Sequence, residues 1–136
     1  MAGSALVDTG FLIALLSRRD RHHRWAAVQS SQVSVPWKTC EAVLSETFFL
    51  LGGHGQRSLA GLLRRKAVVP AFDLAGNLDR VLGLIEKYSD VPMSLADACL
   101  VRMSEILADP IVLTTDKDFR IYRRHGRQVV SCSTPY

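Results

Sequence analysis

Two short apolar segments, one near each end of the chain, stop abruptly at an aspartate. They are Ala5-Leu6-Val7-Asp8 and Ile111-Val112-Leu113-Thr114-Thr115-Asp116. Short apolar runs of this kind are typical of buried strands in a parallel sheet. Because α/β proteins bind ligands at the carboxyl ends of such strands, we expect both carboxylates at the functional edge of a sheet.

The rest of the chain alternates between helical and extended patterns. We expect strands at Ser4–Val7, Ala67–Leu74, Ile111–Thr115 and Gln128–Ser131. Pro70 favours an edge position or a bulge for the second of these. We expect helices at Gly10–Ser17 with Thr9 as N-cap, from the Asp20 cap to Ser30, and at Trp37–Leu51, Gln56–Lys66, Asn77–Tyr88, Ser94–Leu107 and Lys117–Arg124. Strands separated by helices predict an α/β fold with a mostly parallel central sheet flanked by helices.

Length and composition are those of a globular chain. Its 136 residues are expected to form one domain spanning 1–136, and its 48% apolar content is sufficient for a core. No apolar run reaches the roughly 20 residues of a membrane span, and Asp8 interrupts the first apolar stretch, so we expect neither a membrane segment nor a signal peptide. The three cysteines show no CxxC spacing, which favours free thiols in a reducing cytoplasm.

Basic residues outnumber acidic ones, with a net charge of +4, and they are clustered. The clusters are Arg18, Arg19, Arg21 and Arg24; Arg64, Arg65 and Lys66; and Arg120, Arg123, Arg124 and Arg127. Each cluster alone is compatible with a solvated helix end. Together they favour a polyanionic partner such as RNA.

Glu46 is the hardest acid to explain by structure alone. On the expected helix its neighbours three and four residues away include Val43, Phe49 and Leu50. An ionised carboxylate on an apolar face is costly unless it is paired or bound to a cation. Glu41 is closer to the start of the helix, where the dipole favours an acid, so we prefer Glu46 as the functional residue.

The other acids each have a structural alternative. Asp8 can form a turn or a helix cap, and Asp97 follows Ser94 in the Ser-x-x-Asp spacing of a capping box. Asp116 or Asp118 can cap the next short helix, which leaves the other free. If Asp8, Glu46, Asp97 and Asp116 meet in space, their carboxylates repel one another unless a cation neutralises them.

The same four acids lie in motifs that resemble those of PIN-domain ribonucleases. The matching segments, in order, are Leu6–Leu15, Val43–Glu46, Ser94–Ala98 and Leu113–Phe119. Their order and approximate spacing are similar to those of the family over nearly the whole chain. The subgroup that the chain resembles most is the VapC-like toxins of prokaryotic toxin–antitoxin systems.

This resemblance implies a three-layer PIN-like fold and a Mg²⁺- or Mn²⁺-dependent endoribonuclease. Asp8, Glu46, Asp97 and Asp116 are then the catalytic residues, with Asp8, Asp97 and Asp116 as metal ligands and Asp118 in reserve. Hard divalent cations prefer such oxygen ligands. RNA is the implied substrate, and a second copy of the chain and a cognate antitoxin are the implied partners. Many such toxins have Asn at the position of Gly10.

Three other classes remain open from the sequence. A receiver-type signalling domain also holds Mg²⁺ with acids at strand ends, but it needs an early acidic pair that Asp8-Thr9 lacks. A haloacid-type phosphatase needs a second Asp where this chain has Gly10. A PIN-fold protein that binds RNA or a partner without cleavage is the third alternative.

Overall fold

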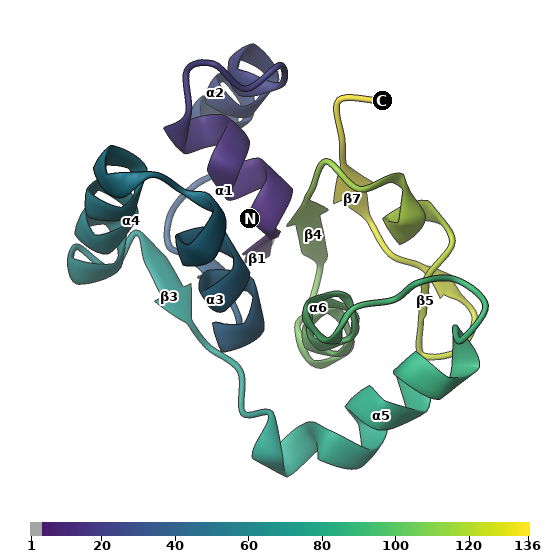
Figure 1. Ribbon diagram of the computed structural model, residues 1–136. Coiled ribbons are helices and arrows are strands. Elements are labelled where there is room, and N and C mark those ends of the chain that lie inside the picture. Colours follow the sequence, from purple (N-terminus) through teal and green to yellow (C-terminus); the bar gives the residue numbers. More distant parts are fainter. Residues whose placement is uncertain (1–3) are drawn as a thin grey trace.

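A parallel sheet of five strands runs through the centre of the protein (Figure 1). The computed structural model describes residues 4–136. In spatial order the strands are β3 (Val68–Pro70), β2 (Trp37–Thr39), β1 (Ser4–Val7), β4 (Pro110–Leu113) and β7 (Cys132–Ser133). The helices around it are α1 (Thr9–Leu16), α2 (His23–Gln32), α3 (Glu41–Leu50), α4 (Gly53–Arg64), α5 (Leu78–Lys87) and α6 (Leu95–Ile106). The expected α/β fold, with a mostly parallel sheet flanked by helices, is confirmed.

Strand β1 lies in the middle of the sheet, between β2 and β4. Val7 pairs with Leu113 of β4, and Leu6 pairs with Lys38 of β2. The Thr39 hydroxyl also donates a hydrogen bond of 2.8 Å to the Val7 carbonyl, which ties the ends of β1 and β2 together. Because the strands are parallel, the residues that follow them emerge at one edge of the sheet.

The core beside this edge is built around Phe11 of α1. Its ring makes edge-to-face contacts with Trp25 of α2, at a centroid distance of 5.8 Å, and with Trp37 of β2, at 5.5 Å. Such aromatic pairs add about 0.5–1.5 kcal/mol each beyond the burial of their area. They hold α1, and hence the residue that precedes it, against the sheet.

Short polar side chains cap two of the helices, α1 and α6, and one of these two caps is the expected one. Ser94 caps α6 and forms the complete capping box with Asp97, which confirms the sequence pattern. The expected N-cap Thr9 is wrong, because Asp8 caps α1 and accepts from the Thr9 backbone N–H. Asp20 does not cap α2; its carboxylate accepts from His22 N–H in the turn before that helix.

The helix expected over Trp37–Leu51 is wrong in its first part. Residues Trp37–Thr39 form β2, and α3 begins only at Glu41. The strand is three residues long, and its apolar pattern continues into the helix without a break. Its parallel pairing with β1 and β3 outweighs the local helical pattern, which only tertiary contacts can reveal.

Two further boundaries are shifted on either side of β3. Helix α4 begins at Gly53, earlier than the expected Gln56, because Gly52 adopts the extended conformation of an N-cap. The strand expected over Ala67–Leu74 is limited to Val68–Pro70. It forms one edge of the sheet, as Pro70 indicated.

The C-terminal segment differs most from the expectation. The helix expected over Lys117–Arg124 is a 3₁₀ turn, Lys117–Arg120, followed by β5 (Arg123–Arg124). The single strand expected over Gln128–Ser131 is instead β6 (Gln128–Val129), which pairs antiparallel with β5. The main sheet is completed by β7, two residues further on. Strands this short carry too few residues for a periodic signal.

Two expectations from composition concern the cysteines and the membrane. The cysteines are free thiols, with Cys40 and Cys99 buried and Cys132 half-buried. Among residues 4–136, no helix has both the length and the apolarity that crossing a membrane requires.

Leu6 tests the central position of β1, because its side chain is fully buried. We expect Leu6→Ala to lower the free energy of unfolding by about 2–5 kcal/mol, through lost burial and a residual cavity. Urea denaturation measures this change. The matched control is Leu82→Ala on the exposed side of α5, which should change stability by less than about 0.5 kcal/mol. Equal effects of the two variants would contradict the assignment of β1 as the core strand.

Candidate active site

Asp8 lies at the junction between β1 and α1, where the chain leaves the sheet. Its carboxylate is buried and has two partners: Oδ1 accepts from Thr9 N–H at 2.8 Å, and Oδ2 accepts from the Thr114 hydroxyl at 2.7 Å. The Asp8 backbone N–H continues the β1–β4 ladder by donating to the Leu113 carbonyl. Both ends of the residue are therefore fixed by β4 and the start of α1.

Thr114 connects Asp8 to Asp116. Its hydroxyl donates to Asp8 and accepts from the Asp116 backbone N–H at 2.9 Å. The Asp116 side chain in turn caps the following 3₁₀ turn by accepting from Asp118 N–H at 2.8 Å. One threonine hydroxyl thus links the carboxylate of Asp8 to the backbone of Asp116.

Asp97 lies in the first turn of α6. Oδ2 accepts from the Ser94 backbone N–H and from the Tyr122 hydroxyl, both at 3.2 Å. Burial and the charges of Asp97 and Asp116 raise the pKa of Tyr122, so its phenol stays protonated and donates. Tyr122 was not among the residues predicted from the sequence. A buried phenol needs a partner, but that signal appears only once its burial is known.

Glu46 lies on α3, and its side chain is exposed to solvent. Phe49 and Leu50 beside it are exposed as well, so the expected buried apolar face is wrong. Burial therefore does not single out Glu46. Its position does, because it lines the same cleft as the other three acids, whereas Glu41 does not.

The four acids line one cleft of about 390 Å³ at the carboxyl edge of the sheet. They come from four elements: the end of β1, helix α3, the start of α6 and the segment after β4. The full lining is Asp8, Thr9, Gly10, Ile13, Glu46, Leu50, Pro92, Ser94, Asp97, Thr115 and Asp116. Asp118 is absent from this lining and contacts the site only through its backbone N–H.

The electrostatics of the cleft disfavour several ionised carboxylates at once. Burial, with the charges of Asp97 and Asp116 adding to it, raises the pKa of Asp8 from 3.8 to about 7. The hydrogen bonds from Thr114 and Thr9 oppose this rise. Burial and the charge of Asp116 likewise raise the pKa of Asp97. A cation in the cleft would relieve both penalties.

The chemistry of these donors fits a hard divalent cation, which prefers carboxylate oxygens. Among residues 4–136, however, no group of three or more His, Cys, Asp or Glu side chains is arranged to hold a metal ion. Direct ligation by Asp8, Asp97 and Asp116 together therefore stays a prediction.

Gly10 is in contact with Thr115 across the cleft. A Cβ on Gly10 would lie 1.9 Å from Thr115 Oγ1 and 3.1 Å from its Cβ. The space that a larger residue at position 10 would need is thus filled by the threonine. This packing accounts for a glycine where many toxins of the resembled subgroup have Asn.

The raised pKa of Asp8 has a consequence for stability. Between about pH 4 and pH 7 the folded chain keeps a proton that the unfolded chain releases, so stability should fall as the pH rises. At about 1.4 kcal/mol per pKa unit, the loss approaches about 4 kcal/mol. We expect Asp8→Asn to remove this dependence in urea denaturation without divalent cations. If the difference in stability between variant and wild type is constant across this pH range, the raised pKa of Asp8 is contradicted.

The contact between Gly10 and Thr115 can be tested by a double-mutant cycle. Gly10→Ala should destabilise the protein by about 1–3 kcal/mol, because the methyl group overpacks against Thr115. In a Thr115→Ala background the same change should cost little, since the obstructing hydroxyl is gone. Thermal denaturation of the four proteins gives the coupling. Additive effects would show that the two residues do not share this space.

Comparison with known proteins agrees with this architecture. The sequence matches the PIN domain family over residues 5–124. No curated protein matches the chain. Among solved structures, the fold is similar to that of VapC20 from Mycobacterium tuberculosis, a toxin that cleaves the sarcin–ricin loop, with a TM-score of 0.65. That protein is 23% identical, and the match covers 74% of this chain and 82% of VapC20.

At this level of identity the likeness to VapC20 shows the fold alone. The family match is stronger support, because it extends from β1 through β5 and includes all four acidic segments. The chain belongs to the PIN domain family.

Proposed function

We propose that the protein is a divalent-cation-dependent endoribonuclease that hydrolyses phosphodiester bonds of RNA in the acidic cleft. The observation that carries this proposal is that Asp8, Glu46, Asp97 and Asp116, from four separate elements, line one cleft. Burial, together with the charges of Asp97 and Asp116, raises the pKa of Asp8 to about 7, and a bound cation would relieve this penalty. Membership of the PIN domain family supports the same activity.

Asp8, Asp97 and Asp116 would hold Mg²⁺ or Mn²⁺, directly or through water, because Mg²⁺ usually keeps several of its waters. When bound, such an ion supplies Lewis-acid activation of water and neutralises charge on the phosphate. Thr114 keeps Asp8 in position by its 2.7 Å hydrogen bond. Tyr122 and the Ser94 backbone N–H do the same for Asp97.

In the reaction, water attacks the phosphorus atom in line with the bond to the 3′ oxygen. That bond breaks, the 3′ oxygen takes a proton from water, and the products are a 5′-phosphate and a 3′-hydroxyl. Glu46, exposed at the cleft, orients the attacking water. The histidines do not line the cleft, and no histidine base is required.

We further propose that the protein is the toxin of a type II toxin–antitoxin system and that it forms a homodimer. The similarity to the fold of VapC20 supports the first part. The adjacent side chains of Phe49 and Leu50 at the end of α3 are 85% and 56% exposed, and such neighbouring apolar groups on the surface support a protein partner, either a second copy or a cognate antitoxin.

Carboxamide variants test the cleft directly. We expect Asp8→Asn and Asp97→Asn to abolish Mn²⁺-dependent cleavage of total RNA and to keep the circular dichroism spectrum of the wild type. Thr114→Val should cost about 10–100-fold in activity, because it removes the hydroxyl that positions Asp8 and Asp116 but leaves both carboxylates in place. EDTA should abolish the wild-type activity.

Helix α3 supplies a matched control for this experiment. Glu46→Gln should lower cleavage, whereas Glu41→Gln, the same change on the same helix but outside the cleft, should not. Full activity in both Asp8→Asn and Asp97→Asn would exclude the site. RNA binding without hydrolysis at any divalent metal would favour a non-catalytic PIN protein instead.

A further inference from the structure

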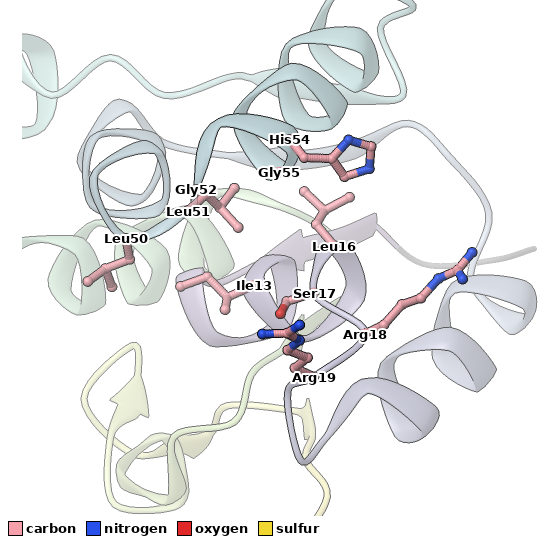
Figure 2. A pocket seen from close by; sticks show the side chains of 10 residues that line it. All are labelled: Ile13, Leu16, Ser17, Arg18, Arg19, Leu50, Leu51, Gly52, His54 and Gly55. Carbon is pink, nitrogen blue, oxygen red and sulfur yellow. The ribbon is translucent and has the colours of Figure 1, made fainter.

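A second pocket lies next to the acidic cleft (Figure 2). It has a volume of about 420 Å³ and lies between the end of α1, the turn after it and the junction of α3 with α4. Its lining is Ile13, Leu16, Ser17, Arg18, Arg19, Leu50, Leu51, Gly52, His54 and Gly55. We call it the arginine pocket. Nothing in the mechanism above uses it.

The arginine pocket adjoins the acidic cleft. Ile13 of α1 and Leu50 of α3 line both spaces, so the two share a wall. A polymer with one phosphate at the carboxylates can therefore extend into the arginine pocket. A compact ligand confined to the cleft cannot reach it.

Arg18 and Arg19 are the cationic groups of this pocket. Both are exposed, and within residues 4–136 neither guanidinium makes a hydrogen bond or an ion pair. In Figure 2 Arg18 and Arg19 lie in the turn after α1, with their side chains extending in different directions, and His54 lies on the opposite side of the pocket. Their charge is free for an external anion.

Three of the four arginines of the C-terminal cluster, Arg120, Arg123 and Arg124, are by contrast hydrogen-bonded within the fold. Arg124 donates to the carbonyl oxygens of Ser104 and Leu107 at the end of α6. Arg123 donates to nearby backbone carbonyls, and Arg120 donates to Thr134. The remaining basic cluster, Arg64, Arg65 and Lys66, begins at the last residue of α4, at the opposite end of this helix from the pocket. Arg18 and Arg19 are thus the arginines beside the cleft whose guanidinium groups are free to bind a ligand.

Two other features of the pocket fit a nucleotide. Helix α4 begins there with no side-chain cap at Gly52 and no acid in its first turn, so its free backbone N–H groups favour an anion. The apolar side chains of Ile13, Leu16 and Leu51 offer a surface for a base. The pocket volume is within the range of small-ligand sites.

We propose that the arginine pocket binds one nucleotide of single-stranded RNA adjacent to the scissile phosphate. Its phosphate lies against Arg18, Arg19 and the start of α4, and its base lies against the apolar wall. This proposal rests on the proposed nuclease function. The pocket supplies the attraction that the acidic cleft cannot, because four carboxylates repel a polyanion. The base must be unstacked to enter, which restricts the strand to single-stranded segments.

Binding of a fluorescent single-stranded RNA, measured by anisotropy in full-length Asp8→Asn protein, tests the pocket without cleavage. Arg18→Gln with Arg19→Gln should raise Kd at least about 10-fold. It should also lower the slope of log Kd against log salt concentration by about 0.7, the value for one phosphate contact on a single strand. The matched control is Arg64→Gln with Arg65→Gln, which removes the same charge from the far end of α4. Equal weakening by the two pairs would overturn the proposal.

Competitors identify the ligand class. Inorganic polyphosphate and polyglutamate of matched charge should displace the RNA at least about 10-fold less well than unlabelled RNA, because they carry no base. Polyphosphate that competes equally would overturn the assignment to a nucleotide. If polyglutamate competes equally, the pocket binds an acidic protein segment, and the assignment to a nucleotide is again overturned.

The two proposals fail separately. One outcome is that wild-type protein cleaves no RNA with any divalent metal while Arg18→Gln with Arg19→Gln still weakens RNA binding more than Arg64→Gln with Arg65→Gln does. In that case the nuclease function is wrong and the pocket stands. If cleavage depends on Asp8 but RNA affinity does not depend on Arg18 and Arg19, the pocket is wrong and the function stands.

Discussion

The parallel pairing of β1 with β4 is the constraint on which the site depends. Val7 and Leu113 are register partners, so the residues that follow them leave the sheet side by side. That register brings Thr114 within 2.7 Å of the Asp8 carboxylate, although 106 residues separate them in the chain. A shift by one residue would turn these side chains to the other face of the sheet. Core packing of β1 thereby determines the geometry of a polar site.

The site is held in place by a few hydrogen bonds against its own electrostatics. Two partners orient Asp8, and the same threonine that holds it also accepts from the backbone of Asp116. These bonds lower the pKa of Asp8, but burial outweighs them and the pKa still rises to about 7. The fold thus stabilises the geometry of the acids and leaves their charge uncompensated, a combination that suits a cation-binding site more than a structural one.

The sequence predicted most of the cleft because its signals are local. Strand ends and a capping box locate Asp8, Asp97 and Asp116 without knowledge of the tertiary structure. Glu46 was chosen for a burial that the structure does not show, yet it does line the cleft. Strand β2 and the partner Tyr122 were missed, since both depend on contacts between segments far apart in the chain. The same limit applies to the basic clusters, because the sequence does not show which arginines are hydrogen-bonded within the fold and which have free guanidinium groups.

That distinction between free and hydrogen-bonded arginines changes the meaning of the net charge. A positive total predicts attraction of RNA in general, but a guanidinium whose N–H groups donate to backbone carbonyls, as in Arg124, has fewer donors left for a direct phosphate contact. The unpaired guanidinium groups of Arg18 and Arg19 lie beside a cleft lined by acids. In the function we propose, opposite charges in adjoining spaces separate two tasks: the arginines would attract the polymer, and the carboxylates would hold the cation. An RNA strand that satisfies both must cross the shared wall of Ile13 and Leu50, which fixes its register relative to the reacting phosphate.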